Sequence, residues 1–308
     1  MRFDSIGLIG YGEVGKTFSA GLISPSGVSR MHARDVKFSN PAVQDAELAH
    51  AAQAGVMACM SMRALCTASE LVISAVTASN TLSVAEEAAS HLQAGSVFLD
   101  LNSASPGTKQ KCAALIEAAG AHYVEAGVMT SVPPYGIKTP MLLGGQKAAE
   151  LAELLNSWGM NAKVVSDKIG VASAIKMCRS VMIKGLEALV IESYTTARAY
   201  GVEDHVLPTL AETFPSIDWQ QTGAYFFSRV VQHGQRRAEE MREAANTVKE
   251  AGFEPLMTTA IADKQQWVAS LAKTGMFDAL SKQAIWQDYA DKLIQQSLQD
   301  SERHQPKN

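Results

Sequence analysis

A single lysine stands inside an apolar helical stretch, where it could carry proton-transfer chemistry. Residues 169–180 read IGVASAIKMCRS, and Lys176 is set among small and apolar side chains. A lysine in such a run either extends its ammonium into water while its stem packs, or is held partly out of water. In the second case the charged form is penalised, the pKa falls, and the amine can exchange a proton near neutral pH. The stretch alone leaves both alternatives open.

A glycine-rich turn near the start of the chain has the spacing of a dinucleotide-binding loop. Residues 5–18 form a short apolar strand that passes through Gly10-Tyr11-Gly12-Glu13-Val14-Gly15 into a helix. In this G-x-G-x-x-G pattern the first glycine permits a tight turn, the second leaves room for a pyrophosphate, and the third lets the helix pack close to the strand. The helix N-terminus then faces the phosphates. We predict that these six residues hold a cofactor, against the alternative of a turn without a ligand.

An acid at the end of the second predicted strand bears on which dinucleotide binds. Asp35 would accept hydrogen bonds from the 2′-hydroxyl of the adenosine ribose, which favours NAD. However, Arg34 and Lys37 flank it and could pair with a 2′-phosphate, so the sequence favours NAD without excluding NADP. Val76 and Thr77 end a further strand and are predicted to face the nicotinamide half, with an ordinary polar loop as the alternative.

The elements that must position these residues alternate in the first half of the chain. Short β-rich apolar runs occur at 5–12, 28–35, 71–76, 96–101, 122–128, 141–145 and 162–166. Alanine-rich amphipathic stretches between them include 83–92, 107–120 and 148–159. This alternation predicts an α/β Rossmann domain over 1–165, built on a mostly parallel, doubly wound sheet with helices on both faces.

After residue 166 the sequence predicts helices only. They are expected at 170–200, about 204–213, 219–233, 234–251, 257–273 and 275–300. We therefore predict an all-α domain over 166–300 for substrate binding and dimerisation, followed by a polar tail over 301–308. Lys176 would lie on the first helix of that domain, at the junction of the two domains, where ligand sites are common.

Composition argues against several classes of partner. The chain has 308 residues, is 47% hydrophobic and carries a net charge of −4, so it can bury large cores and has no basic block for nucleic acid. We expect neither a membrane-spanning segment nor a signal peptide, because no sufficiently long apolar run occurs. Its four cysteines are scattered without a CxxC pair, which favours the reducing cytoplasm. No metal-ligand spacing occurs, and we predict no metal requirement.

Four blocks in a fixed order resemble a known enzyme family. They are GLIGYGEVG, then DLNSASP at 100–106, then a segment before MLLGG, and then G-x5-K from Gly170 to Lys176. Over most of its first 200 residues the chain resembles the β-hydroxyacid dehydrogenases, which include 3-hydroxyisobutyrate dehydrogenase, tartronate semialdehyde reductase and 6-phosphogluconate dehydrogenase. The resemblance implies a nicotinamide cofactor, a small carboxylate substrate, and assembly into dimers or tetramers.

The resemblance also implies roles for the substrate pocket, with one departure from the family. Asn102 and Ser103 match the polar pair that lines the pocket. Where the family reads PVSGG and supplies backbone amides to the substrate carboxylate, this chain reads AGVMTSVPPYG over 126–136. Thr130 and Ser131 could donate hydroxyls there, whereas the prolines remove backbone donors.

The lysine helix departs from the family as well. Lys176 matches the catalytic lysine, but Ser180 replaces the asparagine that usually follows four residues later. Ser180 shares a helical face with Lys176 and could hold a substrate hydroxyl with less reach. In oxidation Lys176 would take the hydroxyl proton as hydride leaves, and in reduction it would protonate the forming alkoxide.

The segment HGQRRAEEMREAANTVKEAGFEP at 233–255 is typical of a less-studied branch of this family. His233, Arg236 and Arg237 cluster at its start. Either these groups pair with glutamates on their own helix, or one of them, Arg237 being our candidate, reaches the cleft and binds a carboxylate bidentately. The second alternative would compensate for the missing amides, and the sequence does not decide between the two.

Three functions remain to be separated. The favoured one is an NAD(P)-dependent dehydrogenase acting on a small hydroxy acid, or on the corresponding oxo acid or semialdehyde. The second is an imine reductase, which would not need a lysine at the proton-transfer position. The third is a non-catalytic dinucleotide-binding sensor. Apolar stretches at 257–290 also predict a homodimer or a higher homo-oligomer. The sequence names neither the substrate nor the physiological direction.

Overall fold

The computed structural model describes residues 1–24 and 27–303, and the chain divides into two compact units. The first unit consists of Met1–Arg179 together with Asn246–Phe253, and the second holds the remainder. The first unit therefore extends beyond the predicted boundary at residue 165. It includes the start of helix α7 (Val171–Tyr200), which carries Lys176, and the end of helix α9 (Trp219–Glu250).

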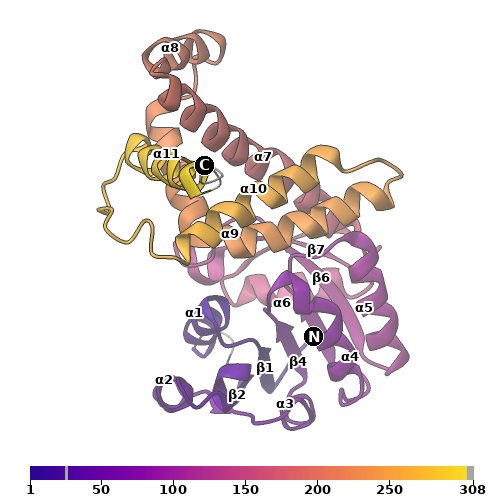
Figure 1. The fold of residues 1–308 in the computed structure, drawn as a ribbon. Helices are drawn as coiled ribbons and strands as arrows, with labels where there is room; N and C mark the ends of the chain where they lie inside the picture. Colours follow the sequence, from indigo (N-terminus) through magenta and orange to yellow (C-terminus); the bar gives the residue numbers. More distant parts are fainter. Residues whose placement is uncertain (25–26, 304–308) are drawn as a thin grey trace. The chain divides into compact units, whose positions relative to one another are not determined.

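The first unit is built on one sheet (Figure 1). The strands are β1 (Ser5–Ile9), β2 (Arg30–Arg34), β3 (Met57–Ala58), β4 (Leu71–Ser74), β5 (Val97–Asp100), β6 (His122–Val128), β7 (Pro140–Gly144) and β8 (Asn161–Ser166). Their order across the sheet is β3-β2-β1-β4-β5-β6-β7-β8, and neighbours are parallel except β6 and β7. The predicted mostly parallel, doubly wound sheet is confirmed.

Helices cover both faces of this sheet. They are α1 (Glu13–Leu22), α2 (Gln44–Gln53), α3 (Met62–Ala68), α4 (Thr81–Ala89), α5 (Pro106–Ala118) and α6 (Ala148–Ser157), with short 3-10 turns η1 (Val36–Ser39), η2 (Ala78–Asn80) and η3 (Gly136–Lys138). One hydrophobic cluster takes side chains from α1, α2 and α6, and a second takes them from α3, α4 and α5. In β4, Leu71 and Ile73 join the first cluster and Val72 the second, because successive strand side chains point to opposite faces.

The order of the strands places a ligand-binding position between β1 and β4. From β1 the chain proceeds to β2 and β3 on one side, and from β4 onward it builds the other side. Ligands of open α/β sheets bind at such a switch point, outside the carboxyl ends of the strands. The loops that follow β1 and β4 start at this edge, and they carry Gly10 and Val76.

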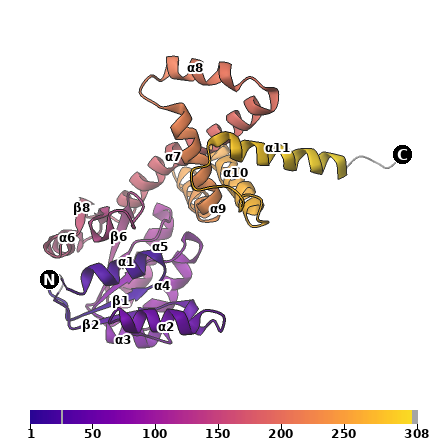
Figure 2. The ribbon, with the colours of Figure 1, turned by 90° about the vertical axis from the view of Figure 1, so that its left-hand side faces the viewer.

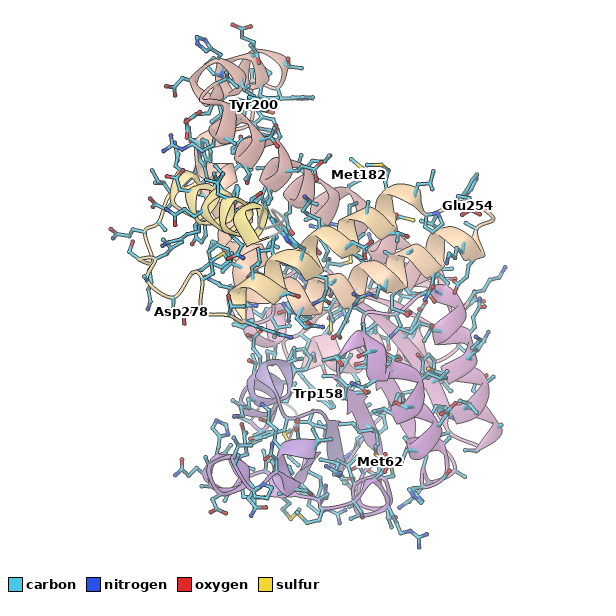
Figure 3. All side chains as sticks on the ribbon, in the orientation of Figure 1. Met62, Trp158, Met182, Tyr200, Glu254 and Asp278 are labelled. Carbon is cyan, nitrogen blue, oxygen red and sulfur yellow. The ribbon has the colours of Figure 1, made fainter. Side chains whose placement is uncertain are left out.

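The regular elements in the described part of the second unit are all helices, as predicted (Figure 2). It contains most of α7 and α9 together with α8 (Glu203–Thr213), α10 (Leu256–Ala272) and α11 (Trp286–Arg303). Its hydrophobic core combines aromatic side chains from several helices, and Tyr194 of α7 packs edge-on against Trp286 of α11 with ring centroids 4.8 Å apart. Apolar side chains on α7 are also exposed, including Met182 at 74% and Tyr200 at 79% (Figure 3). The predicted homodimer stays a prediction.

Two predicted helix boundaries in this unit are wrong. A break was expected at Gly234, but α9 continues through it as one helix of 32 residues. The glycine is there for close packing, since a Cβ at this position would lie 2.8 Å from the carbonyl oxygen of Gln265. A helix was also expected from 275, but Gly275 has a φ of +82° and α11 begins only at Trp286. Residues 301–303 of the predicted tail are helical, and 304–308 lie outside the described residues.

Neither a membrane span nor a metal cluster is found in the part of the chain that the structure describes. No helix there is both long enough and apolar enough to cross a bilayer. No three His, Cys, Asp or Glu side chains there are grouped as a metal site requires. The cysteines are unpaired, with Cys178 exposed and the other three buried.

Candidate functional site

The glycine loop between β1 and α1 has the shape that a pyrophosphate needs. Gly10 has a φ of +94°, and a Cβ there would lie 2.3 Å from the carbonyl oxygen of Ala75. A Cβ on Gly15 would lie 2.2 Å from the carbonyl oxygen of Gly10. By contrast, a Cβ on Gly12 would meet nothing within 4 Å, so the loop is open at the position predicted to face the phosphates. Helix α1 follows directly, and its first N–H groups can bind an anion.

The other residues of the loop divide into buried and exposed side chains. Tyr11 is completely buried, its hydroxyl lies 3.2 Å from Nδ1 of His50, and burial raises the pKa of its phenol. Val14 packs against the first hydrophobic cluster. Glu13 is exposed, and its carbonyl oxygen accepts a hydrogen bond from Thr17. The side chains of Tyr11 and Val14 therefore support the loop, and a dinucleotide would meet mainly its backbone.

Asp35 is held beside this loop by backbone hydrogen bonds. The N–H of Tyr11 donates to Asp35 Oδ2 over 2.6 Å, and the N–H of Lys37 donates to Oδ1 over 2.9 Å. Arg34 donates to the backbone carbonyl of Asp35. Each carboxylate oxygen has a second lone pair, so Asp35 keeps the capacity to accept from a ribose hydroxyl. Its carboxylate is thus fixed next to the glycine loop, as the sequence pattern requires.

The loop after β4 depends on Asn102, which sequence reasoning placed in the substrate pocket. Asn102 Oδ1 accepts from the N–H of Val76 over 2.7 Å, and Nδ2 donates to Ser74 Oγ over 3.0 Å. Thr77 follows and accepts a hydrogen bond from Asn80. The amide of Asn102 is buried and positions the loop predicted to face the nicotinamide.

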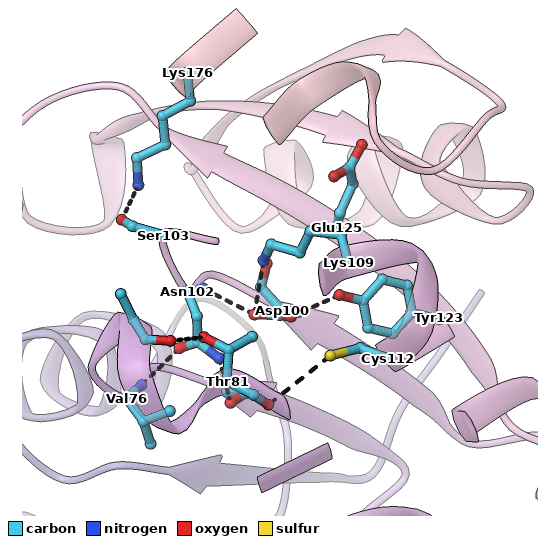
Figure 4. Close-up of polar contacts among 12 residues, drawn as sticks. Val76, Thr81, Asp100, Asn102, Ser103, Lys109, Cys112, Tyr123, Glu125 and Lys176 are labelled. Atoms are coloured by element: carbon cyan, nitrogen blue, oxygen red, sulfur yellow. Dashed lines mark hydrogen bonds and ion pairs between the residues drawn. The ribbon is translucent and has the colours of Figure 1, made fainter. Parts of the chain in front are cut away.

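A buried charged network shapes the turn that carries Asn102 and Ser103 (Figure 4). Lys109 Nζ lies 2.9 Å from Asp100 Oδ1, and the Tyr123 hydroxyl donates to Asp100 Oδ2 over 2.6 Å. The N–H of Asn102 donates to Asp100 Oδ1 over 2.8 Å. Burial and the neighbouring Asp100 raise the pKa of the Tyr123 phenol well above its usual value. Asp100 therefore ties the turn to α5 and β6.

Lys176 and Ser103, both predicted from the sequence, are brought together. Lys176 is 8% exposed, and its Nζ donates a hydrogen bond to Ser103 Oγ (Figure 4). The amine is thus largely out of water, and the alternative in which it reaches into solvent does not describe its side chain. Both residues belong to the first unit, which also contains the glycine loop.

Two residues that the sequence did not place in the site hold the start of the lysine helix; Glu125 was interpreted from the sequence as a strand-end carboxylate, and Gly127 was given no role. Glu125 on β6 is completely buried, and its Oε1 accepts from the N–H groups of Gly170 and Ala172 over 2.8 and 2.9 Å. It therefore occupies the helix N-terminus, where a carboxylate is stabilising. On the same strand a Cβ at Gly127 would lie 3.0 Å from the carbonyl oxygen of Ala172, so a glycine permits close approach. The available signal was an acid inside a buried strand.

Glu250 was also missed, and no local signal could have found it. It is the last residue of α9 and belongs to the first unit. Its Oε1 accepts from Ser105 Oγ over 2.7 Å, and its Oε2 accepts from the N–H of Gly107 over 2.8 Å. Ser105 is itself the N-cap of α5, accepting from the N–H of Thr108. A residue distant in sequence thus completes the cap next to the turn that carries Ser103.

The segment that replaces PVSGG folds into a turn after β6. The carbonyl oxygen of Val132 accepts from the N–H groups of Tyr135 and Gly136, which closes the turn. Thr130 is exposed and Ser131 is half-buried at its start. The geometry leaves both hydroxyls near the end of β6, and their predicted role toward a carboxylate stays a prediction.

In the second unit, Ser180 is bonded to a lysine one turn along α7, whereas Arg237 is bonded to a glutamate of a different helix. Ser180 Oγ accepts from Lys184 Nζ over 3.2 Å, and Lys184 pairs with Glu240 over 2.8 Å. Arg237 Nη1 lies 2.9 and 2.8 Å from the two carboxylate oxygens of Glu187. Burial raises the pKa of the Glu187 carboxyl, although the charge of Arg237 acts to lower it. Arg237 thus pairs with another helix, α7, which neither sequence alternative anticipated.

Comparison with known proteins identifies the family. The sequence model for the NAD binding domain of 6-phosphogluconate dehydrogenase matches residues 5–166, which is more than half of the chain. The chain belongs to this family. A second model, a domain of unknown function (DUF1932), matches residues 197–268. The resemblance seen in the sequence, with its divergent C-terminal part, is confirmed.

Solved structures of relatives cover nearly the whole chain. A conserved hypothetical protein from Sinorhizobium meliloti 1021 is 38% identical, with 94% of this chain and 95% of that chain covered and a TM-score of 0.73. Conserved protein MTH1747 of unknown function, which is structurally similar to 3-hydroxyacid dehydrogenases, is 31% identical, with 88% and 98% covered and a TM-score of 0.66. The fold is also that of 3-hydroxyisobutyrate dehydrogenase from Salmonella typhimurium, at 17% identity, 94% and 99% coverage and a TM-score of 0.63. Together these findings support an NAD(P)-dependent oxidoreductase.

Proposed function

We propose that this protein transfers hydride between NAD(P) and a small hydroxy acid, or its oxo acid or semialdehyde, with Lys176 as the general acid and base. The observation that carries the proposal is the buried amine of Lys176 on the hydroxyl of Ser103, in the same compact unit as the glycine loop. A lysine amine held largely out of water is unusual in a protein core, because burying a charged group is costly. Proton transfer to and from a substrate oxygen is a function that such a buried amine can perform.

The residues of the chain would divide the work as follows. A bound nicotinamide would accept or supply the hydride. Lys176 Nζ would remove the proton from a substrate hydroxyl during oxidation and return it to the forming alkoxide during reduction. Ser103 fixes the direction of the amine, while Glu125 and Gly127 fix the helix that carries it. We assign NAD as the preferred dinucleotide because Asp35 stands beside the loop.

Two other functions are compatible with the cofactor end. An imine reductase would not need a lysine at the proton-transfer position, so the buried Lys176 argues against it. A non-catalytic sensor would retain the glycine loop and Asp35 but would show no turnover. Only the proposed dehydrogenase has to bind a substrate carboxylate, and the hydroxyls of Thr130 and Ser131 are our candidates to bind it.

The test is turnover measured at 340 nm with NAD and NADP against short 2- and 3-hydroxy acids, sugar acids and β-hydroxy amino acids. Lys176→Ala is compared with the parent and with Lys111→Ala, which removes an exposed lysine from α5. We expect Lys176→Ala to lower kcat by about a hundredfold or more, as the loss of a general acid or base does. The control variant should retain full activity, and both variants should still bind NADH.

Each other result contradicts part of the proposal. Turnover that survives in Lys176→Ala would show that the lysine is structural. Reduction of cyclic imines without turnover of any hydroxy acid would favour the second function. Binding of NADH without turnover of any compound in the panel would favour the sensor.

A further inference from the structure

Helix α2 carries an acid, Glu47, that is paired with two lysines of the cofactor-binding end. Glu47 Oε2 lies 2.7 Å from Lys16 Nζ, and Oε1 lies 3.6 Å from Lys37 Nζ. The Glu47 side chain is only 14% exposed, whereas those of Lys16 and Lys37 are 30% and 45% exposed. The two lysines hold the pKa of the Glu47 carboxyl below its usual range, so it is charged near neutral pH.

Both lysines belong to segments that the dinucleotide would meet. Lys16 directly follows Gly15 in α1, and its Nζ also lies 5.8 Å from the ring centroid of Tyr11. Lys37 is two residues after Asp35, and its N–H donates to the Asp35 carboxylate. These segments border the position of the adenosine ribose in a Rossmann domain. The pairing with Glu47 therefore concerns the part of the cofactor in which NAD and NADP differ.

The charges beside the expected position of the adenosine ribose show how an acid on α2 affects the choice of dinucleotide. Arg34, Lys37 and Lys16 contribute three positive charges at this edge, and Asp35 and Glu47 contribute negative ones. A 2′-phosphate is bound through cations of this kind, so the edge would suit NADP despite Asp35. Glu47 offsets the two lysines and brings a second negative charge close to them.

We propose that Glu47 is a specificity-determining residue, which disfavours NADP by pairing with Lys16 and Lys37 and so leaves Asp35 to select NAD. This inference rests on the proposed dinucleotide-dependent function. It assigns discrimination to two acids on different elements, one at the end of β2 and one on α2.

The experiment compares Kd values for NADH and NADPH, measured by nicotinamide fluorescence at low ionic strength. Glu47→Gln keeps the shape of the side chain and removes its charge. We expect NADPH to bind about tenfold more tightly, as removal of one charge near a surface phosphate should allow, and NADH to change by less than about threefold. Asp45→Asn is the matched control, because it removes an exposed acid from the same helix and should leave the ratio unchanged.

A second variant keeps the inference testable if Glu47→Gln does not fold. Lys37→Met in the parent should weaken NADPH binding by less than about twofold, because its charge is already offset. In the Glu47→Gln background the same substitution should remove most of the gain. A tenfold loss of NADPH affinity from Lys37→Met alone, or an unchanged ratio in Glu47→Gln, would overturn the role of Glu47. A parent protein that binds neither dinucleotide would instead overturn the proposed function.

Discussion

Two buried polar networks, one in each unit, differ in how completely their atoms are paired. In the NAD-binding domain, the carboxylate of Asp100 is paired on both oxygens, by Lys109 and by Tyr123. In the helical unit, Glu187 is paired with Arg237 and Gln265, but Arg237 Nε and Gln265 Oε1 are buried without a hydrogen-bond partner. In the first network, both oxygens of the central carboxylate have partners within the same unit. In the second, two buried polar atoms have no hydrogen-bond partner.

This difference shows what each network contributes. A fully paired network in a low dielectric holds its members rigidly, and the one around Asp100 fixes the turn that presents Ser103 to Lys176. A partly paired network leaves buried donors and acceptors without hydrogen bonds, and this lowers the free energy of unfolding. The Asp100 network is therefore expected to dominate stability, and the Glu187 network to be more tolerant of change.

The largest effect should come from breaking the Asp100 network. Lys109→Met keeps the side-chain length and leaves the Asp100 carboxylate buried without its cation. We expect the free energy of unfolding to fall by about 3–5 kcal/mol, the range found when one partner of a buried pair is removed. Urea unfolding followed by circular dichroism measures it. Lys111→Met, on the exposed side of the same helix, should change stability by less than about 0.5 kcal/mol. A loss below about 1 kcal/mol for Lys109→Met would mean that Asp100 is not held as a buried charge.

A smaller and pH-dependent effect should follow in the helical unit. Arg237→Met removes the cation that opposes the burial-induced rise in the pKa of Glu187, so this pKa should rise further in the folded protein. An acid whose pKa is raised on folding stabilises the protein as the pH falls and destabilises it as the pH rises. We expect a loss of about 2–4 kcal/mol at pH 8 and a clearly smaller loss at pH 5.

The matched control for this change is Arg236→Met, since Arg236 is the exposed neighbour of Arg237. Its thermal unfolding should match that of the parent at both pH values. Equal losses for Arg237→Met at pH 5 and pH 8 would contradict the assignment of the pH dependence to Glu187.

The smallest effect should come from the cap that Glu250 adds to α5. Glu250→Gln keeps the hydrogen-bonding shape but removes a negative charge from the helix N-terminus. We expect a loss of about 0.5–1.5 kcal/mol in the free energy of unfolding. Glu254→Gln alters an exposed acid four residues later and should have no measurable effect. A loss as large as that of Lys109→Met would show that this contact is more than a helix cap.

Features that depend on neighbouring residues were predictable from the sequence. The G-x-G-x-x-G turn was recognised because its glycines are required by contacts within one strand-turn-helix unit, such as that between Gly10 and Gly15. The alternating apolar runs predicted the sheet for the same reason, although β3 was missed because two residues show no periodicity. Lys176 was identifiable because a charged residue in an apolar helix is conspicuous in the sequence itself.

Sequence patterns alone therefore predicted the Rossmann domain, the helical second half and the residue types available for chemistry. The partners of those residues became known only from the folded chain. Asn102 supports Val76, Arg237 pairs with Glu187 of another helix, and Glu250 caps a helix that begins more than a hundred residues earlier. The physical reason is that a short-range pattern reflects the local backbone and hydrophobic periodicity, whereas a side chain's charge and hydrogen bonds are satisfied by whichever group the folded chain brings within about 3 Å.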